Sequence, residues 1–240
     1  AIAEMKQWLL KQKQVQAWDN PVATADAVYA FLGGDDNQLA ESSAMKAEIS
    51  GTEVVTPDDA LGYVRRSFSG DEAETRQIEI AHTGAGIGWG AVYAQYLEDM
   101  DQLQSAKGNG LKITRTYYRD GKEVSSKTDL HVGDELTVRL TVKADRDMDF
   151  IQIKDTRAAC MEPKEVLSGY RHSDAIGYYQ VMRDTSAEFF IDKLRKGIVQ
   201  IEYKVYIDRP GTYQTGIATV QSAYAPEFAG HTKSLSVTVR

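Results

Sequence analysis

The sequence predicts a mainly β protein whose larger part is an antiparallel β-sandwich, preceded by a small β-unit and a short N-terminal helical hairpin. Three observations support this fold class. Apolar residues recur at helical spacing near the N-terminus, in residues 3–13 and 22–32. From about residue 44 the period changes to two, and turn clusters separate the alternating runs. The 240 residues are 42% hydrophobic and 26% charged, which is enough apolar material for a folded core.

The hairpin is predicted to contain two short helices. Asn20-Pro21 fits the N-cap and first position of the second helix, and Gly33-Gly34 fits its C-terminal stop. Two helices joined by a brief turn cannot bury an apolar face by themselves. We therefore expect residues 1–34 to be the end of a larger helical domain.

Residues 35–105 are predicted to form the small β-unit. Strand-like alternation includes Ile49, then Tyr63 and Arg65, then Ile78 and Ile80. The glycines of residues 84–90 alternate along a strand, instead of following the G-x-G-x-x-G or G-x-x-x-x-G-K-[ST] spacing of phosphate loops, and no Lys follows. This run therefore favours a glycine-faced strand over a nucleotide site.

Residues 111–240 are predicted to form the sandwich, after a linker at residues 105–110 that contains Lys, Gly and Asn. The clearest alternation sets Leu136, Val138, Leu140 and Val142 on one face and polar residues on the other. Similar runs lie at residues 151–154, 178–182, 199–207, 213–220 and 235–239. Seven or so short strands with frequent turns are typical of a β-sandwich.

Composition excludes two classes of partner. Every apolar run is interrupted well short of the ~18 residues that a membrane-spanning helix requires, so this chain has no predicted span. The net charge is −7 and the pI about 5.2, with no Lys/Arg cluster longer than a pair, which makes nucleic acid a poor candidate. Basic and acidic residues number 8 and 17 in residues 1–110 but 20 and 18 in residues 111–240, which indicates two units.

No metal site is expected from the spacing of ligand residues. Asp145, Asp147 and Asp149 match the first, third and fifth places of a calcium loop, but Phe150 occupies the place of the turn glycine and Thr156 that of the bidentate Glu. We interpret this segment as a charged turn between strands. The four histidines, His82, His131, His172 and His231, are scattered without an H-x-x-x-H or H-E-x-x-H pair and are interpreted as surface residues.

No catalytic or cofactor-binding residue is predicted either, and the chain is not expected to be an enzyme. A G-x-S-x-G elbow is missing from the sequence, and nothing singles out a pair among the 35 acidic residues. The single cysteine, Cys160, precedes Met161-Glu162-Pro163, which differs from the thioester-forming C-x-E-Q because Pro163 has no side-chain carboxamide. Cys160 is therefore interpreted as a small apolar residue or a lone thiol.

Several segments, in order, resemble the C-terminal end of a bacterial alpha-2-macroglobulin, a large envelope protein that traps proteases. They are residues 8–14 and 23–30, the G-x-G-I-x-W-G-A-x-Y core of residues 84–98, Val132-Gly133-Asp134, residues 145–150, residues 168–171 and residues 224–228. The resemblance implies three parts: residues 1–34 as the last helices of the thioester-bearing α/α toroid, residues 35–105 as a CUB-like β segment, and residues 111–240 as the terminal macroglobulin domain with an immunoglobulin-like sandwich.

The same resemblance implies a function. The chain would be the C-terminal structural part of an endopeptidase inhibitor in the periplasm or cell envelope. Its partners would be the remainder of the same polypeptide, namely the toroid and other macroglobulin domains, and the trapped proteases. The Tyr224-Ala225-Pro226 loop would be an inter-domain latch that keeps the thioester dry.

Two kinds of alternative stay open. A tyrosine on a Pro-braced loop suits a local core position as well as a latch. An Ig-like binding or adhesion module of the cell envelope is the alternative function, for which 13 tyrosines offer contact material. A glycosidase with two carboxylates on a β scaffold finds no support in the spacing of the acidic residues.

Overall fold

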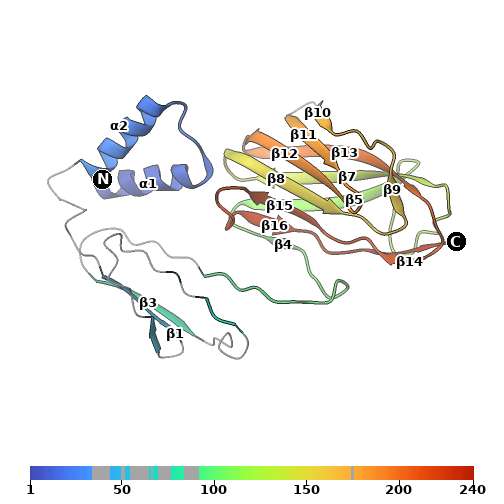
Figure 1. Ribbon diagram of the computed structural model, residues 1–240, viewed down its shortest axis with the longest axis horizontal. Helices are drawn as coiled ribbons and strands as arrows, with labels where there is room; N and C mark the ends of the chain where they lie inside the picture. Colours follow the sequence, from blue (N-terminus) through green and yellow to red (C-terminus); the bar gives the residue numbers. More distant parts are fainter. Residues whose placement is uncertain are drawn as a thin grey trace. The chain divides into compact units, whose positions relative to one another are not determined.

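The computed structural model describes residues 1–33, 44–49, 52–54, 65, 67–69, 77–83, 92–173 and 176–240 (Figure 1). The chain divides into two compact units. One consists of Ala1–Leu10 and Trp18–Gln95, and the other of Lys11–Ala17 and Tyr96–Arg240. Within the described residues, no helix is both long enough and apolar enough to span a membrane.

Both predicted helices are confirmed. Helix α1 spans Ile2–Val15 and helix α2 spans Pro21–Leu32. Asn20 is the N-cap of α2, because its side-chain oxygen accepts a hydrogen bond of 2.9 Å from the backbone N–H of Ala23. No residue of α2 is buried, so this helix keeps its apolar side chains at its surface.

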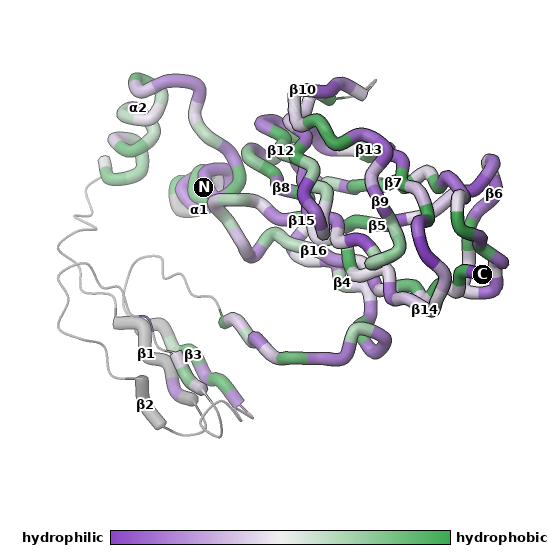
Figure 2. The backbone as a smooth tube through the Cα atoms, turned by 45° about the vertical axis from the view of Figure 1, so that its right-hand side comes forward, coloured by the Kyte–Doolittle hydropathy of each residue, from purple (hydrophilic) through white to green (hydrophobic). Residues whose placement is uncertain are grey.

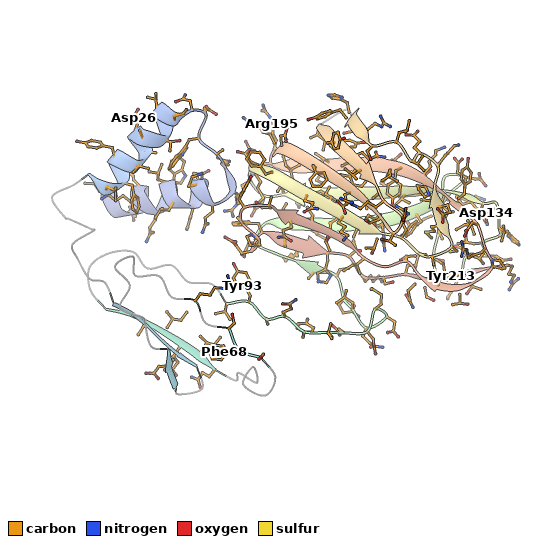
Figure 3. The ribbon with its side chains drawn as sticks, viewed as in Figure 1. Asp26, Phe68, Tyr93, Asp134, Arg195 and Tyr213 are labelled. Atoms are coloured by element: carbon orange, nitrogen blue, oxygen red, sulfur yellow. The ribbon has the colours of Figure 1, made fainter. Side chains whose placement is uncertain are left out.

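A three-stranded antiparallel sheet forms the core of the small β-unit. Strand β1 (Ala44–Ile49) lies between β2 (Thr52–Val54) and β3 (Ile78–Thr83). The predicted strands at Ile49 and at Ile78 are thus confirmed, whereas Arg65 lies outside any strand. Tyr63 and the glycine run 84–90 lie outside the described residues. Residues 92–99 have no regular structure, and the exposed side chain of Tyr93 is labelled in Figure 3.

The C-terminal part is a sandwich of two antiparallel sheets (Figure 1). The seven-stranded sheet has the order β10-β11-β12-β8-β15-β16-β4. Its strands are β4 (Ala106–Lys107), β8 (Met148–Thr156), β10 (Gly169–His172), β11 (Gly177–Met182), β12 (Ser186–Leu194), β15 (Ala218–Ser222) and β16 (Ala229–His231). The five-stranded sheet has the order β6-β5-β7-β13-β9. Its strands are β5 (Leu111–Arg119), β6 (Lys122–Glu123), β7 (Glu135–Ala144), β9 (Met161–Pro163) and β13 (Gly197–Ile207), and β14 (Gly211–Gln214) pairs separately with β17 (Ser236–Val239).

The core lies between the two sheets. Along β7 the predicted apolar face is fully buried, with Leu136, Val138 and Leu140 at 0% exposure. The seven-stranded sheet contributes Ile151, Ile153 and Phe189 to the same cluster. Alternating hydrophobic and hydrophilic residues are visible along the strands of the sandwich in Figure 2. The period-two pattern therefore identified the buried faces correctly.

One predicted strand is wrong. Residues 213–220 form two strands, β14 and β15, which pair with β17 and with β8. Gly216 between them has a φ of +67°, a left-handed conformation that interrupts an extended run. The chain therefore changes partners at this glycine.

The predicted linker at residues 105–110 is also wrong, because β4 lies within it and pairs with β16. A methyl group on Gly108 would lie 1.9 Å from the carbonyl oxygen of Ala229. Gly108 thus serves close approach of two backbones, a role that composition alone does not distinguish from flexibility.

A buried ion pair links the two sheets. Arg115 of β5 pairs with Asp155 of β8, and their side chains are 2% and 0% exposed. The Asp155 carboxylate also accepts a hydrogen bond of 2.7 Å from the Tyr203 hydroxyl of β13. Burial raises the pKa of Tyr203 well above its usual value, so this hydroxyl remains a donor.

The two terminal nitrogens of Arg115 make further hydrogen bonds. Its guanidinium donates to the carbonyl oxygens of Thr156 and Gly216, at 2.9 and 2.6 Å, and to Thr215 Oγ1 at 2.9 Å. A buried charge is tolerated when it is paired and hydrogen-bonded in this way. The network therefore fixes β5, β8, β13 and the chain around Gly216 to one another.

We predict that Asp155→Ala destabilises the chain by about 3–5 kcal/mol, because it leaves the Arg115 charge buried without its partner. Urea denaturation measures this loss. The double variant Asp155→Leu with Arg115→Met should recover much of it, since both charges are then replaced by apolar groups. A double variant as unstable as Asp155→Ala would show that the stranded charge is not the cause.

Candidate functional site

The predicted latch residues lie in the loop that joins β15 to β16. Tyr224 is 79% exposed, Ala225 is 3% exposed and Pro226 is at the surface. The three residues therefore have different environments. The loop is anchored through Ala225 and presents the Tyr224 ring outwards.

Backbone hydrogen bonds hold the loop in place. Ser222 N–H donates to the Phe228 carbonyl, and Phe228 N–H donates to the Ala225 carbonyl, both at 2.9 Å. Phe228 itself is 5% exposed and belongs to the core cluster. Two buried side chains and a closed set of backbone bonds make this a well-fixed loop.

The Tyr224 ring rests on one neighbouring aromatic side chain. Its centroid lies 5.2 Å from that of Phe150 on β8, with the two planes at 87°. The Ala223 N–H donates to the Phe150 carbonyl at 2.9 Å, so backbone and ring contacts occur together. The exposed ring contradicts the alternative of a core position for Tyr224. The latch stays a prediction.

Phe150 is a functional candidate that sequence reasoning missed. Its φ is +55°, a left-handed conformation that bulky residues rarely adopt. The sequence carried a signal, because position 150 is where a calcium loop has its turn glycine. In the sequence this Phe served only as evidence against a calcium loop, and its contacts with Ala223 and Tyr224 are seen only in the structure.

Each of the three aspartates before Phe150 has a partner within the chain. Asp145 pairs with Arg146 at 2.9 Å. The carboxylate of Asp147 accepts from Lys196 N–H at 2.7 Å, and that of Asp149 accepts from Ala17 N–H at 2.7 Å. These contacts agree with the interpretation as a charged turn. In the described part of the chain, no group of three or more His, Cys, Asp or Glu could hold a metal ion.

Cys160 lies in the core. Its exposure is 0%, and burial raises the pKa of its thiol. It therefore stays protonated and packs as a small apolar residue. The adjoining Pro163 is in edge strand β9, paired with Val205.

A shallow polar cleft lies elsewhere on the sandwich. The residues that line it are Thr137, Glu165, Arg171, Tyr178, Gln180, Met182, Glu202, Tyr203 and Lys204. The lining contains no Ser, Cys or His, so it offers no nucleophile–base pair of those types.

The exposed position of Tyr224 generates a stability prediction. Tyr224→Ala should reduce the free energy of unfolding of this chain by less than about 1 kcal/mol, because only one exposed ring contact is lost. Phe189→Ala, in the core, should cost about 3–5 kcal/mol in the same urea titration. If Tyr224→Ala lowered the free energy of unfolding as much as Phe189→Ala does, Tyr224 would be a core residue and the latch would be contradicted.

Comparison of the chain with models of protein families identifies its C-terminal half. Residues 110–227 match the family described as "Bacterial Alpha-2-macroglobulin MG10 domain". The match contains the Arg115 network, the turn at residues 145–150 and the Tyr224 loop. Among curated proteins, none matches this chain.

Solved structures show the same fold. Trypsin-activated alpha-2-macroglobulin from Escherichia coli aligns over 96% of this chain with a TM-score of 0.54 and 16% identity, and the alignment covers 16% of that protein. Escherichia coli alpha-2-macroglobulin activated by porcine elastase aligns over 96% of this chain with a TM-score of 0.53 and 16% identity, covering 21% of that chain. The chain thus spans only a small part of these proteins. Residues 110–227, which make up most of the sandwich, therefore belong to the bacterial alpha-2-macroglobulin MG10 domain family.

Proposed function

We propose that this chain is the C-terminal structural part of a large bacterial alpha-2-macroglobulin-like endopeptidase inhibitor, which traps proteases. The MG10 domain supports this role, and so does the fold shared with proteins described as activated by trypsin and by elastase. In this proposal, the 240-residue chain is not an enzyme and uses no cofactor. Its partners are the rest of the polypeptide and the target proteases, and its place is the periplasm or cell envelope.

The same proposal assigns the three parts of the chain. Residues 1–34 are the last helices of the toroid, residues 35–105 are the CUB-like β segment, and residues 111–240 are the terminal macroglobulin domain. The surface of α2 supports the first assignment, because Val22 and Tyr29 are 69% and 80% exposed. Apolar side chains in such positions suit a helix that packs against further helices.

The observation that carries the functional proposal is the Tyr224 ring, exposed on a fixed loop. An interface residue contributes most when little conformational freedom is lost on binding. Tyrosine suits this use, because it combines apolar ring area with a hydroxyl that can hydrogen-bond. In the inhibitor, Tyr224-Ala225-Pro226 would press against the toroid and exclude water from its thioester until the bait is cut.

The test uses the full-length inhibitor, if its toroid contains C-x-E-Q. Tyr224→Ala should raise the rate of reaction with methylamine about tenfold or more, because a buried interface aromatic is worth about 2 kcal/mol. Tyr170→Ala is the matched control, since Tyr170 is 73% exposed and makes a similar ring contact of 5.0 Å with Tyr179. Equal rates for both variants and the wild type would contradict the latch.

A second candidate function, an adhesion module, is favoured by one specific observation. Tyr170, Tyr179 and Phe190 lie opposite one another across β10, β11 and β12, and are 73%, 38% and 37% exposed. A row of exposed aromatic rings on a sheet is suited to contact with sugar rings or protein. The inhibitor proposal predicts no binding on a glycan array. Binding that Tyr179→Ala abolishes would favour the adhesion module instead.

A further inference from the structure

We propose that residues 145–150, the turn after β7 together with the first residues of β8, couple residues 15–17 to the Tyr224 loop. In this arrangement Asp149 and Phe150 are positioning residues for Tyr224. The inference rests on the proposed latch function, but the contacts that carry it lie within one compact unit, which includes both Lys11–Ala17 and Tyr96–Arg240.

The first contact is between the turn and residues 15–17. Ala17 N–H donates to Asp149 Oδ2 at 2.7 Å, and Gln16 Nε2 donates to the Asp147 carbonyl at 2.9 Å. Val15 is 3% exposed and belongs to the core cluster of the sandwich. A hydrogen bond to a carboxylate is stronger than one between neutral groups. The chain just after α1 is therefore bound to this turn at two successive residues, Gln16 and Ala17, next to a buried Val15.

The second contact is between the turn and the latch loop. Phe150, the neighbour of Asp149, supports the Tyr224 ring and accepts the Ala223 N–H with its carbonyl. Its left-handed backbone stores strain, which persists only where surrounding contacts maintain it. Arg146 adds a contact, with its guanidinium carbon 5.5 Å from the centre of the Phe228 ring.

These contacts attach both residues 15–17 and the Tyr224 loop to the same turn. Asp149 and Phe150 are adjacent in the chain, so a backbone rotation that moves the Asp149 side chain away from Ala17 also shifts the Phe150 carbonyl that accepts the Ala223 N–H. The strain at Phe150 favours such a rotation once the opposing contacts are lost. In the inhibitor, where we assign residues 1–34 to the last toroid helices, movement of those helices would displace residues 15–17 and therefore loosen Tyr224.

Amide hydrogen exchange, measured by NMR on the 240-residue chain, tests the coupling because it reports local opening. Asp149→Ala removes the acceptor of Ala17, and we expect exchange at both Ala17 and Ala223 to accelerate at least tenfold. Asp149→Asn retains a side-chain oxygen and should have a smaller effect. The control is Glu123→Ala, an exposed carboxylate on β6 in the other sheet, which should change neither amide. Unchanged exchange in β7 and β13 would show that the fold is intact.

A reverse experiment makes the result decisive. Coupling is reciprocal, so loosening the latch side must also loosen residues 15–17. Phe150→Ala removes the ring but keeps the strain of a non-glycine residue at positive φ, and should accelerate exchange at Ala17 several-fold. Faster exchange at Ala17 alone in Asp149→Ala, or unchanged Ala17 exchange in Phe150→Ala, would overturn the coupling. Neither result depends on methylamine reactivity, which tests the latch itself.

Discussion

The buried pair of Arg115 and Asp155 is the interaction on which the rest of the sandwich depends. It joins the two sheets, and its remaining hydrogen bonds reach β13 and the turn at Gly216. Strand β8 carries Asp155 near its C-terminal end and Phe150 near its N-terminal end, and it pairs with β12 on one side and β15 on the other. A strand fixed in this way gives Phe150, and through it Tyr224, a rigid base.

This arrangement separates stability from the proposed function. The side chains that hold the domain together are buried, whereas the Tyr224 ring is largely exposed to solvent. A side chain exposed on a loop that is braced from several directions is well suited to recognition. The MG10 family match gives this arrangement its context, because macroglobulin domains are parts of larger polypeptides.

Much of the fold could be predicted from the sequence, and the failures have physical causes. The alternation in residues 135–143 and the Asn20-Pro21 cap predicted β7 and α2 correctly. Strand β5 escaped because Arg115 occupies an inward position between Ile113 and Tyr117, and β12 because Phe190 faces outwards beside the buried Phe189. In retrospect, Arg115 could have indicated a buried ion pair, since a charge on an inward face requires a buried partner.

The candidate site could be predicted from the sequence only in part. The Tyr224 loop was found through its resemblance to a family motif, but its support was not. Ala17 and Asp149 are 132 residues apart in sequence, and no local pattern links them. In the sequence, Phe150 counted only against a calcium loop, and no local pattern predicts its left-handed backbone, which tertiary contacts maintain.

The most direct test of the account is to find what Tyr224 touches in the intact inhibitor. A photoreactive benzoylphenylalanine placed at position 224 of the full-length protein would be irradiated before and after cleavage by trypsin, and the cross-linked peptides identified by mass spectrometry. The account predicts cross-links to the helical toroid of the same polypeptide in the uncleaved protein and their loss after cleavage. Cross-links confined to residues 96–240, or unchanged by cleavage, would contradict it.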